Sequence, residues 1–433
     1  MSTVDYYIEQ LNTIQAAKQD SPLAPVRKSA LDTFTNMGFP TSRNEEWKYT
    51  RIGSIFKKEF RLQNEDITSF NQSSIDAVRL PGHENANELV FVNGRYSEEF
   101  SKIISDEIIV TSLEAAASDE YADIVKAYFN SSSKYLKDGI NALNAAYAQG
   151  VFIYVPKAKV VPHPVYIYNI VDAVADAVCA LPRCLVYVSE AAEVSFVETY
   201  ATLGASESIT NQVTEIIVAE NANVSYCKIQ NDNSKASQVS TTHIHQVGKS
   251  YAETVTISLD GGIVRNNLNI VMGAAHSEAH MYGLYFQNGE SHIDNHTIVD
   301  NVMPHCQSNE LYKGILNDRS TGVFNGRIYV RQDAQKTNAF QSNKNILLGE
   351  NATVNTQPQL EIFADDVKCS HGCTVGSLDE EGIFYLQSRG IPKEVAMSLL
   401  LQGFALDILE KIKIEHIRTY VQELIAARLT TQI

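Results

Sequence analysis

The chain has 433 residues, of which 44% are hydrophobic and 20% are charged. This composition is typical of a soluble globular protein and excludes a wholly disordered chain, while the length predicts two or three domains or one elongated domain with terminal additions. The formal net charge of −16 argues against a nucleic-acid binder, because an acidic surface repels phosphate backbones.

The beginning of the chain is predicted to be helical. Over the first ~60 residues apolar side chains recur at helical spacing, Ser21 and Pro22 separate two segments, and Gly38 followed by Pro40 marks a stop. The opening Met-Ser-Thr-Val-Asp has neither the basic nor the apolar region of a signal peptide. We therefore expect a cytoplasmic protein.

A mixed pattern follows Gly82. Residues 89–92 have the composition of a short strand, Asn93-Gly94 is a turn signal, and residues 118–147 return to helical spacing. Because helical patterns dominate on both sides of the short strand, we assign residues 1–148 to a mostly helical N-terminal domain.

Residues 149–378 are predicted to form an all-β core. Short alternating segments rich in Val, Ile, Thr and Tyr succeed one another, and three similar segments, each a polar turn with a small residue before a strand, begin at Ser189, Ala219 and Gly349. Small residues at recurring corners favour a stacked coil. A β-sandwich gives the same local alternation, so alternation alone leaves both architectures open.

The C-terminal residues 379–433 are predicted to form a helical domain. Apolar residues fall at helical spacing after Pro392, which suits the first turn of a helix, and a second helical segment covers residues 414–429. Such a pair of helices could close the β stack or dock a partner, and the two roles are compatible.

No long apolar segment could cross a membrane. The stretch at 151–161 is interrupted by Pro156, Lys157 and Lys159, far short of the ~18 residues that a span needs. Six cysteines are too few for a disulfide framework, so we expect reduced thiols whose positions matter for metal or redox chemistry.

The densest group of metal-capable side chains is Cys369, His371 and Cys373. In a strand all three would face one side, but neighbours two apart are separated by ~6.6 Å, so at most two could reach one ion. A complete site therefore needs ligands from elsewhere, and the thiolates favour iron and sulfide. The alternative that both cysteines are small buried hydrophobes stays open.

Other histidines offer a rival hypothesis. His292 and His296 have the four-residue spacing of many metal pairs, and His305 follows a proline, so a metal-dependent enzyme could use these three. The His-Glu-x-x-His motif is absent, and surface or hydrogen-bonded histidines are the simpler interpretation of these residues and of the pairs His243/His245 and His276/His280.

Motifs of nucleotide and acyl-transfer chemistry are also missing. Gly248-Lys249-Ser250 resembles the end of a phosphate-binding loop, but the glycine required five positions earlier is His243. The sequence contains neither a Gly-x-Ser-x-Gly elbow nor a Gly-x-Gly-x-x-Gly fingerprint. These motifs therefore give no support to an enzyme.

Three segments resemble the SufB/SufD family of the SUF iron-sulfur cluster assembly system. They are FPTSRNEEWKYT at 39–50, QLEIFADDVKCSHGCTVG at 359–376 and FYLQSRGI at 384–391. The resemblance implies a right-handed parallel β-helix core between N-terminal and C-terminal helical domains. In the first segment we expect Trp47, with its charged neighbours, to form a packing and capping cluster instead of a chemical site.

Two positions favour the SufD branch of that family. SufB-like chains carry a functional cysteine on the strand before a Leu-Leu-Gly turn, and Asn343 occupies its place here. SufB-like chains also tend to have Glu after the histidine of the Cys-Ser-His motif, where this chain has Gly372.

The resemblance implies a non-catalytic scaffold subunit that pairs with SufB through the β-helices. His371 is then implicated in assembling a transient iron-sulfur cluster at the SufB interface, as a transient metal ligand, with Cys369 as a weaker candidate and Cys373 often replaced by alanine in relatives. No cofactor is expected to stay tightly bound to the isolated chain. An exposed β-helix edge favours a homodimer when SufB is absent.

The resemblance also implies a second partner, the SufC ATPase, which would supply ATP hydrolysis that this chain has no motif for. SufC is expected to dock on the C-terminal helices. The residues of this expected docking site are Pro392, Val395, Leu399, Phe404 and Ile408.

Overall fold

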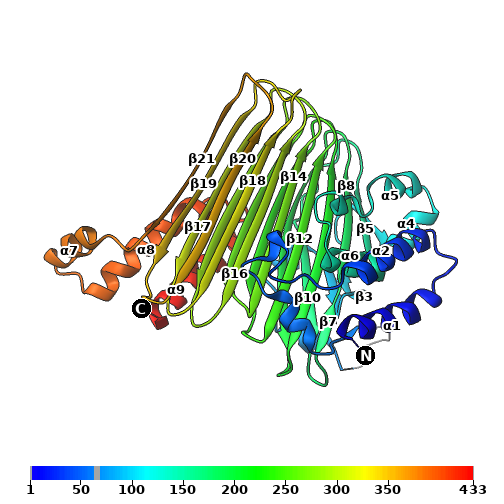
Figure 1. Cartoon of the computed structure of the whole chain (residues 1–433), viewed down its shortest axis with the longest axis horizontal. Coiled ribbons are helices and arrows are strands. Elements are labelled where there is room, and N and C mark those ends of the chain that lie inside the picture. Colours follow the sequence, from blue (N-terminus) through cyan, green and yellow to red (C-terminus); the bar gives the residue numbers. More distant parts are fainter. Residues whose placement is uncertain (1, 63–68, 433) are drawn as a thin grey trace.

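The structure is a computed structural model that describes residues 2–62 and 69–432. Strands make up 41% of it and form a parallel β-helix of about 8 turns, with helices at the N-terminal and C-terminal ends (Figure 1). The expected fold class, a parallel β-helix core between helical ends, is therefore confirmed, and a β-sandwich is wrong.

The strands of the coils alternate between two sheets. Sheet A contains β1 (Arg61–Leu62), β4 (Ile109–Ser112), β5 (Gly150–Val155), β7 (Val178–Ala180), β8 (Arg183–Val188), β10 (Ser208–Val218), β12 (Ala236–Gln246), β14 (Ile263–Met272), β16 (His292–Asn301), β18 (Thr321–Val330) and β20 (Thr353–Ile362). Sheet B contains β2 (Asn87–Val92), β3 (Arg95–Lys102), β6 (Val165–Asp172), β9 (Glu193–Leu203), β11 (Asn223–Asn231), β13 (Tyr251–Asp260), β15 (Glu278–Gln287), β17 (Gln307–Leu316), β19 (Asn338–Leu347) and β21 (Lys368–Gly376).

Equivalent residues of successive coils lie beside one another. Asn223 of β11, for example, pairs with Glu193 of β9, 30 residues earlier. Inside the β-helix this register places similar side chains of successive coils beside one another. One example is the row of aliphatic residues Ile216, Ile244, Ile270, Val299 and Ile328. Such β-branched side chains suit a pleated, buried surface, and they form the interior core.

The three similar segments of the sequence do not occupy one repeat position. Those that begin at Ser189 and Ala219 lead into β9 and β11, which are neighbours in sheet B. The third, from Gly349, leads into β20 of sheet A. The shared pattern therefore reflects similar corner chemistry at different corners of the coil.

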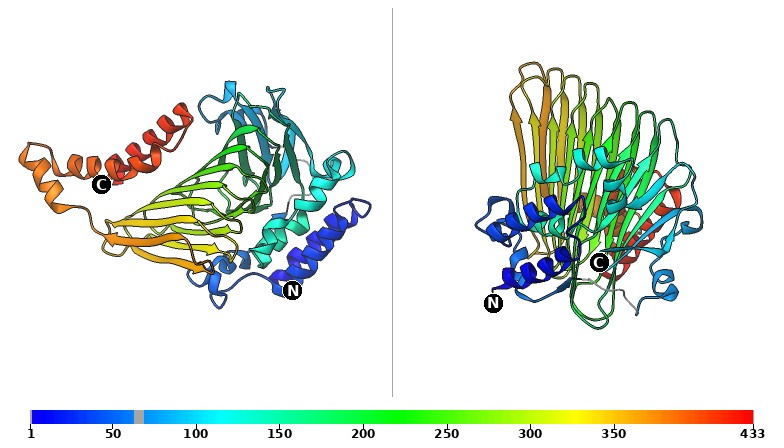
Figure 2. Two further views of the ribbon diagram at one scale, coloured as in Figure 1. Left: turned by 90° about the horizontal axis from the view of Figure 1, so that it is seen from above. Right: turned by 90° about the vertical axis from the view of Figure 1, so that its right-hand side faces the viewer.

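Most N-terminal helices cover the outer face of sheet A. The N-terminal helices of the described part are α1 (Thr3–Ala16), α2 (Ala24–Met37), α3 (Gln72–Asp76), α4 (Leu113–Ser118), α5 (Ala122–Tyr128) and α6 (Gly139–Tyr147), with 3-10 turns η1 (Glu45–Trp47), η2 (Ile52–Lys57), η3 (His83–Asn85) and η4 (Ser131–Lys134). Of these, α3 and η3 lie beside sheet B, where Ile75 packs with Tyr166 and Tyr168. Phe34, Trp47 and Tyr147 pack against Ile209 and Val239 of sheet A. Figure 2 shows α1, α2 and α6 on the opposite side of the coils from the C-terminal helices.

The expected short strand and its turn are confirmed. Residues 87–92 form β2, and Asn93 and Gly94, both with positive φ, turn the chain into β3. β3 pairs antiparallel with β2, and β4 pairs antiparallel with β5, so parallel stacking ends at these strands.

The C-terminal helices α8 (Lys393–Leu409) and α9 (Glu415–Gln432) cover the outer face of sheet B. The helix before them, α7 (Glu380–Ser388), packs on α8 and projects beyond the coils (Figure 1). Buried Ile408 and Val421 pack against Ile257 and Leu284, so α8 and α9 share a core with the sheet. The two segments expected from periodicity correspond to α8 and α9, whereas α7 was not anticipated as a helix of its own.

Candidate functional site at the open end of the β-helix

The coils end at β20 and β21, each of which is the last strand of its sheet. β20 pairs only with β18, and β21 only with β19, among the described strands. The outer edge of both strands is therefore unpaired, and both strands run parallel to their neighbours, whereas the other end of the coils finishes in the antiparallel strands β3 and β4. We call this the open end (Figure 1).

Cys369, His371 and Cys373 lie on β21. Their register partners on β19 are Ala339, Gln341 and Asn343, which are all buried in the interior. The three side chains therefore continue inward-facing rows past the last coil, and their predicted common face is confirmed.

The three side chains differ in exposure. His371 and Cys373 are exposed, whereas Cys369 is half-buried and packs against the interior core. The interpretation of both cysteines as small buried hydrophobes is thus wrong for Cys373 and partly right for Cys369. Burial raises the pKa of the Cys369 thiol, which disfavours the thiolate in the isolated chain.

A polar column runs inward from His371. Gln341 lies directly below it in the register and Glu310 one coil further, 31 residues before Gln341. The Gln341 amide donates a hydrogen bond of 2.7 Å to a carboxylate oxygen of Glu310. Sequence reasoning missed this column, although its residues are spaced by the length of one coil, which is near 30 residues, and this spacing could have predicted that they lie beside one another.

Burial raises the pKa of Glu310 from 4.5 to about 7. Below pH 4.5 the carboxyl is protonated in both folded and unfolded chains. As the pH rises toward 7 only the unfolded chain ionises, so folding stability falls, and above 7 the loss is complete. Glu310→Gln should therefore be more stable than the wild type at about pH 8, by on the order of 1–3 kcal/mol, and nearly equal at about pH 4.5.

Urea unfolding across this pH range measures the difference between the two proteins. Glu99→Gln is the matched control, because Glu99 is an exposed carboxylate on β3. It should leave the stability unchanged at every pH. A Glu310→Gln protein that is no more stable than the wild type above pH 7 would show that Glu310 is ionised without cost.

The position that the family resemblance aligns with a SufB cysteine is occupied by a structural amide. Asn343 is fully buried, and its Nδ2 donates to the hydroxyl of Tyr285 at 3.1 Å and to the carbonyl of Tyr312 at 3.3 Å. This side chain closes an interior hydrogen-bond network and offers no thiol for a cluster.

Exposed apolar side chains surround the open end. Phe340 on β19, Ile362 at the end of β20, Phe363 just beyond it and Val375 on β21 are exposed, with Phe363 the most exposed at 58%. We call these four residues the apolar rim. Large apolar groups in one region of a surface mark association sites.

The expected SufC-docking residues divide into two groups. Pro392, Val395 and Leu399 are exposed near the beginning of α8. Phe404 is half-buried, and Ile408 is fully buried against sheet B. Only the first group is therefore available to another molecule.

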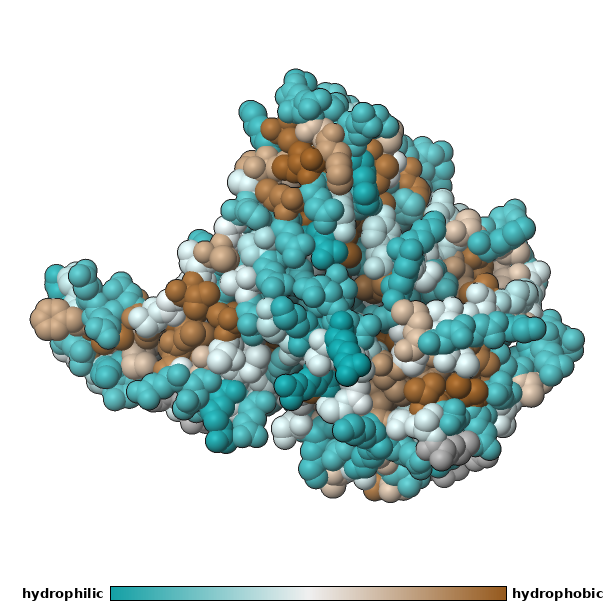
Figure 3. Space-filling view, in the orientation of Figure 1, coloured by the Kyte–Doolittle hydropathy of each residue, from teal (hydrophilic) through white to brown (hydrophobic). Residues whose placement is uncertain are grey.

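Further exposed apolar residues extend this first group. Phe384 and Tyr385 on α7 are 73% and 57% exposed, and Leu406 on α8 is 43% exposed. Figure 3 shows hydrophobic surface over the region of α7 and α8. Sequence reasoning missed Phe384 and Tyr385, because the helix that carries them is short.

The three histidines of the rival enzyme hypothesis have separate partners. His292 Nε2 lies 2.8 Å from the hydroxyl of Thr50, and His296 Nε2 lies 3.0 Å from Asp294 on the outer face of sheet A. His305 instead stacks on His276 at a coil corner, with ring centroids 4.7 Å apart. Nowhere in residues 2–62 and 69–432 do three His, Cys, Asp or Glu side chains gather to hold a metal.

The N-terminal signature is a packing cluster, as expected. Arg265 lies over the ring of Trp47 at 4.5 Å and pairs with Asp294 at 2.6 Å, while the indole donates to Asp138 at 3.2 Å. A hydrogen bond with His296, aided by Arg327, lowers the pKa of Glu46 to about 2. Histidine, arginine and carboxylate groups here hold the N-terminal segment on the sheet.

Two further observations bear on the class of the protein. Within the part of the chain that the structure describes, none of the helices has the length and apolar character to span a membrane. All six cysteines are free thiols. The chain is thus a parallel β-helix protein with reduced cysteines and a histidine displayed at one open end.

Comparison with known proteins identifies its family. Residues 2–167 match the model of the SufBD protein N-terminal region, and residues 170–404 match that of the SUF system FeS cluster assembly SufBD core domain. The chain belongs to the SufBD family of the SUF iron-sulfur cluster assembly system.

Full-length relatives include proteins named SufD. The chain is 29% identical to the iron-sulfur cluster assembly protein SufD of Escherichia coli, over 94% of this chain and 93% of the relative. It is 27% identical to an iron-sulfur cluster assembly SufBD family protein of Synechocystis, over 95% and 92%, and 25% identical to SufD of Bacillus subtilis, over 92% and 91%. These matches support the SufD branch.

Proposed function

We propose that this chain is a non-catalytic scaffold subunit of a cytoplasmic SUF complex, in which it joins SufB and the SufC ATPase to build iron-sulfur clusters. The observation that carries the proposal is the display of His371 on the terminal strand, on the same inward-facing side as Cys369 and Cys373. A neutral imidazole ligates iron near neutral pH, and thiolates bind iron and sulfide.

SufB completes the site in this proposal. Extended residues two apart are ~6.6 Å apart, so a cluster held by His371 needs ligands from a second molecule. The open end offers unpaired strand edges and the apolar rim, two features that favour association with another β-helix. The cluster is bound only transiently and is passed on to other proteins. When SufB is absent, the same surface would pair two copies of this chain.

SufC docks on the exposed apolar residues of α7 and α8 in this proposal. The buried half of α8 cannot take part, because it is anchored to sheet B. Lys313 Nζ contacts Asp407 at 2.5 Å and the carbonyl of Phe404 at 2.8 Å, and these contacts fix the helix on the core. A firmly held helix can pass force from an ATPase to the β-helix.

Anaerobic co-purification of this chain with SufB and SufC tests the proposal. We expect one complex whose visible absorption, iron and sulfide content grow when cysteine-derived sulfide and iron are supplied, while the chain alone accumulates no cluster. Failure to associate with either partner, or a stable cluster on the isolated chain, would refute the scaffold role.

A further inference from the structure

A cavity of about 420 Å³ lies between the N-terminal segments and the outer face of sheet A. Three parts of the chain enclose it: residues 37–47, residues 134–139, and the strands β14, β16 and β18. It opens on the outer face of sheet A, and none of the residues assigned to the proposed function lines it.

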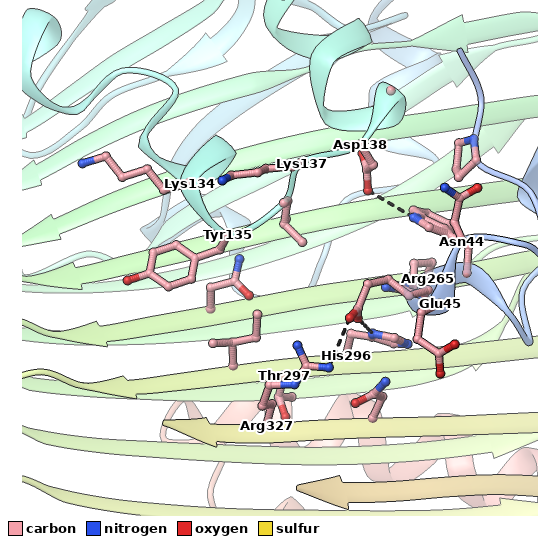
Figure 4. A pocket seen from close by; sticks show the side chains of 18 of the residues that line it. Asn44, Glu45, Lys134, Tyr135, Lys137, Asp138, Arg265, His296, Thr297 and Arg327 are labelled. Carbon is pink, nitrogen blue, oxygen red and sulfur yellow. Dashed lines mark hydrogen bonds and ion pairs between the residues drawn. The ribbon is translucent and has the colours of Figure 1, made fainter. Parts of the chain in front are cut away.

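Two lysines place positive charge at one side of this cavity. Lys134, the last residue of η4, and Lys137, between η4 and α6, line it with exposed side chains, and in the described structure neither forms an ion pair (Figure 4). Both ammonium groups are therefore free to bind an anion.

The other charged groups of the cavity are already engaged. Arg265 pairs with Asp294 at 2.6 Å, Arg327 with Glu46 at 3.1 Å, and Arg331 with Asp300 at 2.7 Å. Two further carboxylates line the cavity: Asp138 caps α6 and accepts from Trp47, and Glu45 is exposed. With the arginines paired, Lys134 and Lys137 are the cations of the cavity without an ion pair, and Asp138 and Glu45 equal them in number.

A buried amide also faces the cavity without a partner. Asn269 on β14 lines it and is only 1% exposed, yet neither its Nδ2 nor its Oδ1 has a hydrogen-bond partner. Leaving both groups of a buried amide unpaired is costly, and a bound molecule would satisfy them. The ring of Tyr135, held by a 2.8 Å hydrogen bond to Asp300, also lines the cavity.

We propose that this cavity binds a small multivalent anion bearing phosphate or carboxylate groups. Lys134 and Lys137 would form ion pairs with its charged groups, and the Asn269 amide would form hydrogen bonds with its polar atoms. The bound anion would tie residues 134–139 to the N-terminal segment and to sheet A. Because the enclosing parts come from far apart in the sequence, occupancy would stabilise the folded chain.

Isothermal titration and thermal unfolding of the full-length chain test this proposal with two separate probes, pyrophosphate and citrate. We expect at least one probe to bind with one-to-one stoichiometry and to raise the melting temperature. Binding of pyrophosphate alone would identify a phosphate site, and binding of citrate alone a carboxylate site. The absence of binding by both probes would overturn the proposal.

Matched variants locate the binding. The double variant Lys134→Gln/Lys137→Gln should bind about tenfold more weakly, because it loses charge-assisted hydrogen bonds, and Asn269→Leu should also weaken binding. Lys126→Gln, which changes an exposed lysine of α5 outside the cavity, should bind as the wild type does. Equal affinity of the double variant and the wild type would overturn the assignment.

Discussion

His371→Ala is expected to leave the chain folded and bound to its partners but to lower cluster build-up in the complex with SufB. The ring is exposed on the last strand and makes no contact that the interior needs, so its loss should not disturb the coils. If it is an iron ligand, the complex should hold roughly tenfold less iron and sulfide after reconstitution. Visible absorption and metal analysis of the anaerobic complex measure this loss.

His305→Ala is the matched control, because His305 is also exposed but lies at a coil corner away from β21. It should give the wild-type cluster yield. Cluster build-up that is equal in the His371 variant and in the wild type would remove His371 from the assembly site while leaving the family assignment intact.

Val395→Asp together with Leu399→Asp should strongly weaken SufC binding. Both residues are exposed on α8, at 48% and 46%, so carboxylates there are hydrated in the free chain. In an apolar interface they would be desolvated without partners, which should weaken the affinity by about 100-fold. Surface-immobilised SufC and the purified variant give the dissociation constant directly.

Gln402→Ala controls for changes to α8 itself, since Gln402 is an exposed polar residue of the same helix. It should bind SufC as tightly as the wild type. Deleting the whole C-terminal region would be a poorer test, because it would uncover Ile257, Leu284 and their neighbours on sheet B. Wild-type affinity of the double aspartate variant would place SufC elsewhere.

Residue patterns predicted much of the fold. The period of two in the β region predicted strands, helical spacing predicted α8 and α9, and Asn93-Gly94 predicted the turn between β2 and β3. Alternation could not distinguish stacked coils from a sandwich, because both bury every second residue. The family resemblance decided that question, and the structure confirms the parallel β-helix.

The site was predictable in part. The common face of Cys369, His371 and Cys373 follows from strand geometry, but their exposure depends on β21 being the last strand, which is a property of the whole topology. The same limit explains Ile408. Helical spacing marks apolar positions, and only the docking of α8 on sheet B decides which of them are buried.

The two ends of the β-helix are unequal, and this sets how large an assembly can grow. One end finishes in antiparallel strands, of which β3 carries the exposed charges of Glu98 and Glu99, and such an edge discourages further strand addition. In the proposed function only the open end associates, so one neighbour saturates it and growth through the coils is expected to stop at a pair. With both ends adhesive, the same chain would polymerise into filaments.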